Sequence, residues 1–257
     1  MRDNVPAIFL INLDQSTQRL KACTDRLNSQ NIPFERLSGV YGKSLTQEEL
    51  ARHYSHTLNL KKYHRALSQG EIGCYLSHRK AWQTIVDRQL DYAIIIEDDF
   101  KIVGPLQDVF DSIADLNFDW QLIKLAAYEN REKPISYKSK LNSHFDLVIH
   151  KKAMTGCCAQ AISLEGAKQL LKATDKFARP VDTDIQHIWE TNVPVYSMMP
   201  YYIEQAGEFE SDIAKASSGA PVKKHFWKRK WHQFQEKRLN HTATCKAIEA
   251  LKVKLNN

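Results

Sequence analysis

The sequence feature that most constrains the fold is an apolar run at residues 92–96 that ends in three consecutive carboxylates. The run reads YAIII, and Glu97, Asp98 and Asp99 follow it directly. A short, β-branched run of this kind is typical of a buried strand. Ligands of open α/β sheets bind outside the carboxyl ends of the strands, so the three acids stand where a ligand is expected.

Three carboxylates at that position indicate a site for a hard divalent cation. Mg²⁺ and Mn²⁺ take oxygen ligands and are commonly shared with the phosphates of a substrate. The alternative is an acidic turn that leaves a strand and serves no ligand. In extended backbone, Glu97 and Asp99 are expected on one side and Asp98 on the other.

Segments with strand and helix patterns alternate along the chain. The expected strands are residues 7–11, 34–37, 92–96, 120–125, 145–149, 158–163 and 195–198. The expected helices are residues 15–30, 164–173 and 181–190, with two more that open at the capping-box pairs Thr46/Glu49 and Ser68/Glu71. Residues 53–67 suggest a loop or a small helical insert, and residues 204–221 a mobile loop. The alternation predicts an α/β domain with a mainly parallel, Rossmann-like sheet and helices on both faces.

Composition narrows the class of protein. With 257 residues, 43% hydrophobic and 26% charged, the chain suits one large domain, or a domain and a tail. No run approaches the roughly 18 apolar residues of a membrane span, and the N-terminal sequence lacks the features of a signal peptide. The five cysteines are odd in number and show no CxxC spacing, so we expect free thiols in a reducing cytosol.

The positive charge is concentrated at the C-terminal end. Residues 222–257 carry ten Lys or Arg against two Glu, a net +8, so the rest of the chain is −2 in a total of +6. We therefore predict a catalytic domain over residues 1–221 and a basic amphipathic helical tail over residues 222–257. The body shows no basic patch, RNA-binding motif or zinc finger, which disfavours nucleic acid as a partner.

Aromatic residues gather on one face of the tail if it is helical. They are Phe226, Trp227, Trp231 and Phe234, with Lys230 beside them. A basic helix with an aromatic face suits an anionic membrane surface. The alternative is a C-terminal helix that packs its aromatics into its own domain.

Six short blocks occur in order between residues 7 and 213. They are 8–14 (IFLINLD) with Arg19; 70–78 (GEIGCYLSH); 94–99 (IIIEDD); Thr155-Gly156 with 161–163 (AIS) and 166–167 (GA); 180–182 (PVD); and Gln205 with 211–213 (SDI). Together they resemble glycosyltransferase family 25, which includes bacterial lipooligosaccharide and lipopolysaccharide glycosyltransferases and collagen galactosyltransferases. The resemblance implies a GT-A fold, a nucleotide-sugar donor (commonly UDP-galactose) and usually Mn²⁺, with Mg²⁺ as the alternative.

The resemblance also implies roles for the acids. Asp99, the last acid of the triplet, would be the metal ligand, with Glu97 as the second candidate. Either Asp98 or Glu97 would contact the ribose side of the donor, and the sequence does not separate these two. A cation there would stabilise the negative charge that develops on a departing diphosphate.

Further donor-binding candidates come from the other blocks. Asn12 and Arg19 follow the first strand, and a guanidinium suits a phosphate or a nucleotide carbonyl, although Arg19 could be a solvated helix residue. Ser77 and His78 lie within a helix, where a histidine is often a core residue. Gly156 would allow close approach of the backbone to a sugar, or mark an ordinary turn. The candidates in the late loop are Gln205, Ser211 and Asp212, which would close over bound UDP or form a linker.

Transfer to a sugar hydroxyl needs a base, and Asp182 is the candidate. It lies after Pro180 at an expected helix start, in a different segment from the acidic triplet. The structural alternative is an N-cap, and Asp184 is a near alternative for the base. The family is generally taken to invert the anomeric carbon by single displacement, which fits one base and one metal.

The leading hypothesis is a galactosyltransferase at the inner face of the bacterial inner membrane. It would transfer a hexose from a UDP-sugar to a hydroxyl of a growing lipooligosaccharide, with the basic tail holding this cytoplasmic protein at the membrane. A catalytically silent sugar- or membrane-binding protein on the same fold is the alternative. A nucleotide-sugar hydrolase, which would release UDP without dependence on an acceptor, is a third option.

Overall fold

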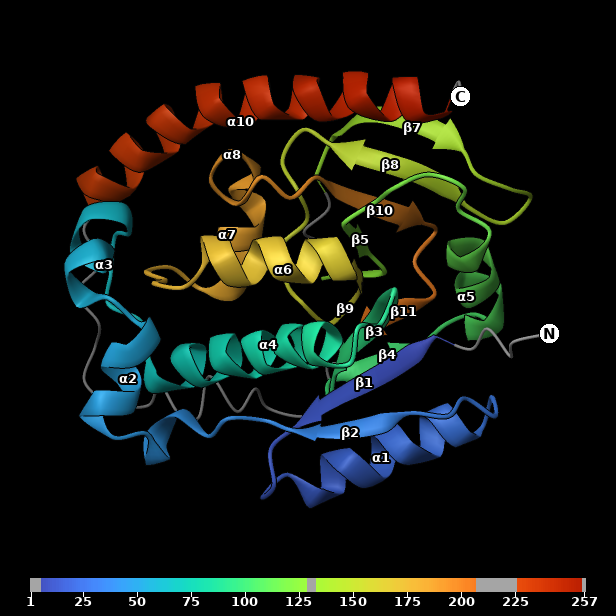
Figure 1. The fold of residues 1–257 in the computed structure, drawn as a ribbon, viewed down its shortest axis with the longest axis horizontal. Coiled ribbons are helices and arrows are strands. Elements are labelled where there is room, and N and C mark those ends of the chain that lie inside the picture. Colours follow the sequence, from blue (N-terminus) through green and yellow to red (C-terminus); the bar gives the residue numbers. More distant parts are fainter. Residues whose placement is uncertain (1–5, 129–132, 207–225, 256–257) are drawn as a thin grey trace.

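The apolar runs assemble into a central eight-stranded sheet (Figure 1). The computed structural model describes residues 6–128, 133–206 and 226–255. In spatial order the strands are β2 (Glu35–Ser38), β1 (Ala7–Asn12), β3 (Tyr92–Glu97), β9 (Ala159–Ser163), β5 (Leu122–Lys124), β10 (Val195–Met199), β8 (Asp146–His150) and β7 (Ile135–Lys140). A second sheet contains β4 (Phe100–Ile102), β11 (Ile203–Gln205) and β6 (Ala126–Ala127).

The central sheet is mixed, so the prediction of a mainly parallel sheet is wrong. β1 pairs in parallel with β2 and β3, and β5 with β10. The pairs β3–β9, β9–β5, β10–β8 and β8–β7 are antiparallel. The reason for the error is burial: β9 is covered on both faces and therefore shows the continuous apolar pattern that is typical of a parallel strand.

Helices cover both faces of the sheet, as predicted. Ile8 and Leu10 of β1 belong to one hydrophobic core, whereas Phe9 and Ile11 belong to the other. The first core includes residues of α1 (Thr17–Asn28), α5 (Leu106–Ala114) and α10 (Phe226–Leu255). The second includes residues of α4 (Gln69–Asp87), α6 (Leu164–Ala173) and α7 (Val181–Gln186). The strand alternation thus gives two helical layers, with α4 and α6 over one face (Figure 1).

Short helices and turns connect these layers. They are the 3₁₀ turn η1 (Gly42–Ser44), α2 (Gln47–His53), α3 (His56–Lys62) and α8 (Ile188–Thr191). Both predicted capping boxes form, at the starts of α2 and α4, so each helix begins where its sequence indicated. The expected insert at residues 53–67 contains α3. The helix expected over residues 181–190 is interrupted at His187 and forms α7 and α8.

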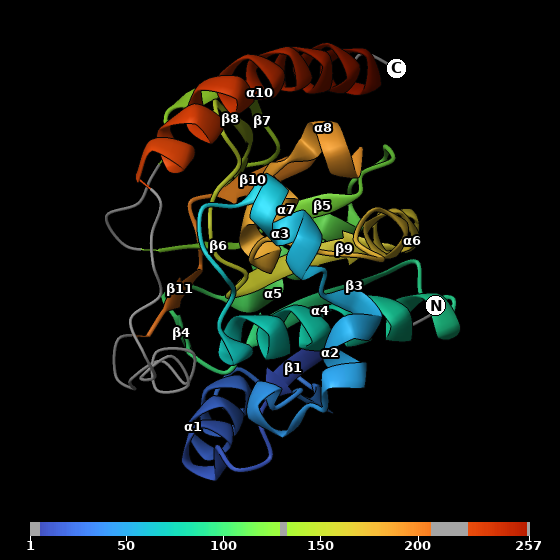
Figure 2. The same ribbon diagram turned by 90° about the vertical axis from the view of Figure 1, so that its left-hand side faces the viewer.

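Helix α10 has two differently exposed parts. Its C-terminal part packs against the body through the buried residues Asn240, Thr244, Ala247 and Leu251. Its N-terminal part extends past the body, as the view in Figure 2 shows. The exposed fractions there are 82% for Trp227, 59% for Trp231 and 73% for Phe234. These aromatics therefore do not pack into the protein's own core, and a different face of the helix does.

Among the helices in the described ranges, none is both long enough and apolar enough to cross a membrane. All five cysteines lie in described segments and are free thiols, as expected.

Candidate functional site

A cleft lies outside the carboxyl ends of β1, β2 and β3. Its volume is about 720 Å³, the open mouth included. The walls come from the end of β1, the loop after β2, one face of α4 and the acidic triplet. Seven of the residues predicted for the site line it, namely Asn12, Arg19, Ser77, His78, Glu97, Asp98 and Asp99. Segments separated in sequence therefore meet where the pattern of strand ends predicted.

Asp98 links the triplet to the end of the first strand and to α1. Its Oδ1 lies 2.6 Å from Nη2 of Arg19, and its Oδ2 accepts a 2.6 Å hydrogen bond from Nδ2 of Asn12. Arg36 in turn donates to Oδ1 of Asn12 at 3.1 Å. Both carboxylate oxygens of Asp98 are thus engaged within the protein, and this geometry gives it a positioning role at the cleft wall.

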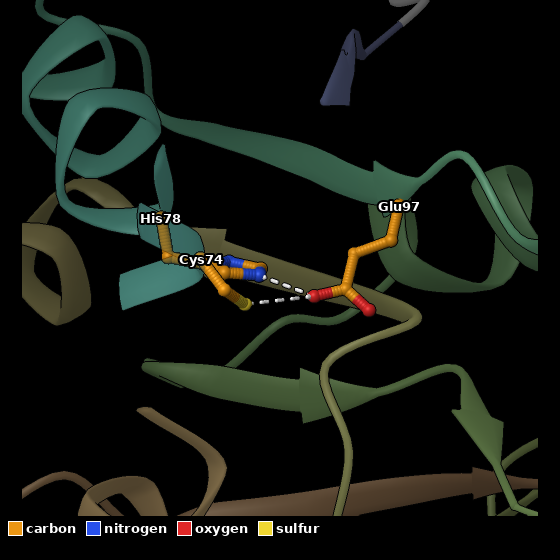
Figure 3. Close-up of side chains that lie close together, drawn as sticks. All are labelled: Cys74, His78 and Glu97. Atoms are coloured by element: carbon orange, nitrogen blue, oxygen red, sulfur yellow. Dashed lines mark hydrogen bonds and ion pairs between the residues drawn. The ribbon is translucent and has the colours of Figure 1, made fainter. Parts of the chain in front are cut away.

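Glu97 faces α4 instead. Its Oε1 lies 2.8 Å from Nε2 of His78 and 3.6 Å from Sγ of Cys74 (Figure 3). Burial acts to raise the pKa of Glu97, but the hydrogen bond with His78 outweighs burial and holds the pKa below its usual range. Glu97 therefore carries a negative charge at the cleft although it is surrounded by protein.

Asp99 has the least satisfied carboxylate of the three. Oδ2 accepts a 2.7 Å hydrogen bond from Gln205, whereas the buried Oδ1 has no hydrogen-bond partner among the described residues. Burial, followed by the charge of Glu97, raises the pKa of Asp99 to about 6. A divalent cation would relieve both effects, so Asp99 and Glu97 fit the metal that the sequence implied.

The loop after β2 forms the cleft wall opposite the triplet, and sequence reasoning missed it. Ser77 Oγ accepts a 2.7 Å hydrogen bond from the backbone of Val40 and donates to the carbonyl of Gly73 at 2.8 Å. A Cβ on Gly73 would meet the Val40 carbonyl at 2.5 Å, and one on Gly42 would meet the Gln69 carbonyl at 1.7 Å. Two glycines thus allow the loop to pack directly on α4, and Ser77 fixes it there.

Gly156 and Asp182 lie together outside the lining of this cleft. The Gly156 backbone has φ +82°, and its N–H donates to Oδ2 of Asp182 at 3.1 Å. A Cβ on Gly156 would meet the ring of Tyr128 at 2.0 Å, so glycine is required by both conformation and space. After burial, the charges of Glu97, Asp99 and Asp182 all raise the pKa of Tyr128. The charges of the candidate base and of two acids of the triplet therefore all act on one phenol.

The near alternative for the base is engaged elsewhere. Asp184 accepts hydrogen bonds from Nε of Arg179 at 2.6 Å and from the Tyr75 hydroxyl at 2.9 Å, and it is buried. Asp184 is therefore a buried core residue of α7. Ser211 and Asp212 lie outside the described residues.

Most of the chain matches a known family. Residues 5–185 match the family described as glycosyltransferase family 25 (LPS biosynthesis protein). Procollagen galactosyltransferase 2 of Homo sapiens is 28% identical over 229 residues, which cover 84% of this chain and 34% of that protein. A putative glycosyltransferase of Haemophilus influenzae is 29% identical over 182 residues, covering 70% of this chain and 61% of that protein. The chain thus spans about a third of the length of the procollagen galactosyltransferase.

Likeness to solved structures is remote. A glycosyltransferase involved in the glycosylation of the major capsid of PBCV-1 has a TM-score of 0.42 at 9% identity, covering 82% of this chain and 97% of that one. A Drosophila β-1,4-galactosyltransferase 7 mutant in complex with manganese, UDP-Gal and xylobiose has a TM-score of 0.38 at 8% identity, covering 84% and 80%. Such scores are too low to place a ligand. The sequence match covers well over half of the protein and carries the conclusion: the chain belongs to glycosyltransferase family 25.

Proposed function

We propose that this protein transfers a hexose, most directly galactose, from a UDP-sugar to a hydroxyl of a growing lipooligosaccharide or lipopolysaccharide core. The description of the family supports a lipopolysaccharide acceptor, and the galactosyltransferase relatives support galactose as the sugar. The observation that carries the proposal is the buried Oδ1 of Asp99, which has no partner among the described residues and lies beside Glu97 at the mouth of a cleft. A carboxylate oxygen buried without a donor is costly unless a cation binds it.

The donor would lie in the cleft outside β1, β2 and β3. Its uridine would lie along the cleft wall that the 39–43 loop forms, and its diphosphate would approach the triplet. Asp99, with Glu97 as second ligand, would hold Mn²⁺ or Mg²⁺. That cation supplies Lewis-acid stabilisation of the charge on the departing diphosphate.

Asp182 would be the base in a single displacement with inversion. As the acceptor oxygen bonds to the anomeric carbon, the bond from that carbon to the diphosphate oxygen breaks, and UDP leaves with the electron pair. The hydroxyl proton passes to Asp182, whose Oδ2 is positioned by the Gly156 N–H. The other oxygen, Oδ1, accepts a longer 3.3 Å hydrogen bond from the Thr183 hydroxyl and is the candidate proton acceptor.

The acceptor would be anchored in a membrane. In this proposal the protein acts at the cytoplasmic face of the inner membrane, and the exposed Trp227, Trp231 and Phe234 of α10 contact an anionic lipid surface. The exposure of this aromatic group, away from the packed part of α10, supports that role.

The test is UDP release from a panel of UDP-sugars, with and without truncated lipooligosaccharide, followed by mass analysis of the acceptor. We expect release with one preferred sugar, a rate that rises with acceptor, and an acceptor mass increased by one hexose. Release that ignores the acceptor would identify a hydrolase. Absence of both release and donor binding would identify a silent binding protein.

A further inference from the structure

Lys124 is a buried amine that the proposed reaction does not use. It lies on β5 with none of its surface exposed. Its Nζ donates to the Gly156 carbonyl at 2.7 Å and to Oε1 of Gln160 at 2.9 Å, and lies 3.8 Å from Sγ of Cys157. Burying a charged amine is costly unless its hydrogen bonds are satisfied. Here its partners are a backbone carbonyl, a side-chain amide and a thiol. The lysine therefore holds these neutral groups in position around it.

The contact with Gln160 determines which way its amide points. A protonated lysine offers donors and no acceptor, so the carbonyl oxygen of Gln160 must face Lys124. The amide nitrogen of Gln160 then faces Nδ1 of His78, at 3.4 Å. An amide NH₂ group only donates, and Nδ1 must therefore be the bare nitrogen that accepts.

The same reasoning continues through the imidazole. A neutral ring with a bare Nδ1 carries its proton on Nε2, which lies 2.8 Å from Oε1 of Glu97. His78 has almost no exposed surface, so its ring nitrogens depend on these protein partners. His78 thus donates from Nε2 to Glu97. Its tautomer is set by Lys124, which acts on His78 through Gln160.

This assignment decides between two interpretations of one cluster. One ligand-type atom each of Cys74, His78 and Glu97 lies within 4.8 Å of the other two, an arrangement that could indicate a metal site. Figure 3 shows the three side chains pointing toward one another. A metal would need Nε2 bare and Nδ1 protonated, and the Nδ1 proton would then point at the amide NH₂ of Gln160. The hydrogen-bonded interpretation has no such conflict, so Glu97 keeps Oε1 for His78 and leaves Oε2 for the cleft.

Lys124 also reaches the opposite side of the site. The Gly156 residue whose carbonyl it holds donates its N–H to Asp182 at 3.1 Å. One buried amine therefore acts on Glu97, through Gln160 and His78, and on Asp182, through Gly156.

We propose that Lys124 is a positioning residue that fixes the Nε2–H tautomer of His78 through Gln160 and fixes Asp182 through Gly156. It sets the geometry of the two carboxylates without touching substrate. Its effect on catalysis rests on the proposed function, whereas the tautomer of His78 does not.

The tautomer is measured by ¹⁵N NMR of the imidazole rings in the full-length protein, with the His78 signal assigned by its loss in His78→Asn. We expect one bare nitrogen, Nδ1, and one protonated nitrogen, Nε2. In Gln160→Glu the new carboxylate accepts from both neighbours, so Nδ1 should become protonated. The signals of His150 and His187, which are also buried, serve as internal controls and should not change.

Kinetics provide the second readout. Lys124→Met should lower kcat by about 10–100-fold, the usual range for a residue behind a ligand. Gln160→Leu should have a smaller effect on kcat, because it leaves the contact with Gly156 in place. If Lys124→Met does not fold, the two Gln160 variants still decide the part of the proposal that reaches Glu97 through His78.

A wild-type His78 protonated on Nδ1, or an unchanged His78 signal in Gln160→Glu, would overturn the proposal. So would wild-type kcat in Lys124→Met. A wild-type protein that shows the expected tautomer but transfers no sugar would instead contradict the proposed function and leave the tautomer assignment standing.

Discussion

At the scale of single residues, neighbouring acids have different environments. Asp98 engages both oxygens in an ion pair and a hydrogen bond, whereas Asp99 has one buried oxygen without a partner among the described residues. The sequence presents the two as equivalent carboxylates. Their different surroundings separate a residue that holds the site together from one available for a ligand.

Stability measurements should separate these two acids. Asp98→Asn weakens the contacts with Arg19 and Asn12 and should cost about 1.5–3 kcal/mol, the usual worth of a charged hydrogen bond. Burial raises the pKa of the Asp99 carboxyl, so its negative charge near pH 7 disfavours the folded protein. Asp99→Asn removes that charge, and the free energy of unfolding near pH 7 should stay the same or increase. Urea denaturation without added metal measures both. Equal destabilisation by the two substitutions would contradict this difference.

The base assignment predicts a separation of binding from turnover. Asp182→Asn keeps an acceptor for the Gly156 N–H but cannot take a proton, so kcat should fall by about 10²–10⁴-fold with donor binding unchanged. The matched control is Asp175→Asn, an exposed acid in the same region of the chain. Transfer at the wild-type rate by Asp182→Asn would remove it as the base.

Acid sensitivity should depend on Glu190. Although burial opposes it, the hydrogen bonds from Arg179, with Lys62 beside them, lower the pKa of Glu190 to about 2 in the folded protein, from an ordinary 4.5. A lowered folded pKa gives stability that is present above about pH 5 and lost as the pH falls toward 2. As the pH falls across this range, the Tm of Glu190→Gln should therefore fall less than the Tm of the wild-type protein. Glu249→Gln, at an exposed position, should follow wild type, and parallel curves for all three proteins would contradict the account.

At the scale of elements, the cleft wall depends on the contact between the 39–43 loop and α4. Gly73→Ala would press a Cβ against the backbone of Val40 and Gly42. We expect a cost of about 1–3 kcal/mol from overpacking and a raised KM for the donor, because the loop must move. Thr84→Ala, a substitution on the same helix outside the cleft lining, is the control. An unchanged KM for the donor in Gly73→Ala would show that this loop takes no part in donor binding.

The parts of the fold predicted from sequence are those with local causes. The capping boxes at Thr46 and Ser68 fixed two helix starts, and the β-branched run at residues 92–96 fixed the strand that carries the triplet. Local patterns carry no information on strand direction when both faces are buried, as in β9. The pattern of α5, with Leu106, Val109, Phe110 and Ile113 buried at helical spacing, was present in the sequence and was missed.

The candidate site was predicted in outline for the same reason. Strand ends brought Asn12 and the triplet to one edge of the sheet, and this needed only chain order. The 39–43 loop and Lys124 were not found, because their roles depend on contacts with α4 and β9 that no local pattern records. The two closely spaced glycines, Gly39 and Gly42, were the available signal for the loop.

At the scale of the whole molecule, α10 combines packing and exposure in one helix. Leu251 is fully buried against the body, so deletion of the entire tail would damage the fold as well as any surface contact. Substitutions separate the two roles better. Leu251→Ala should cost about 2–5 kcal/mol of stability, as a buried leucine does.

The exposed aromatics should affect lipid binding without affecting stability. In the double substitution Trp231→Ala and Phe234→Ala, we expect binding to phosphatidylglycerol vesicles to weaken by about tenfold or more, with Tm and turnover of a soluble acceptor unchanged. Vesicle co-sedimentation measures the first and thermal unfolding the second. Vesicle binding at the wild-type level would show that α10 is a structural helix only.

The central claim is that sugar transfer depends on a cation bound at Asp99. The most direct measurement is the affinity for UDP-galactose by calorimetry. It compares wild type with Asp99→Asn, each in the presence of Mn²⁺ and in the presence of EDTA. The account predicts tight binding by wild type with Mn²⁺, weak binding with EDTA, and weak binding by Asp99→Asn under both conditions. Wild-type affinity that ignores Mn²⁺, or Asp99→Asn that binds as wild type does, would contradict it.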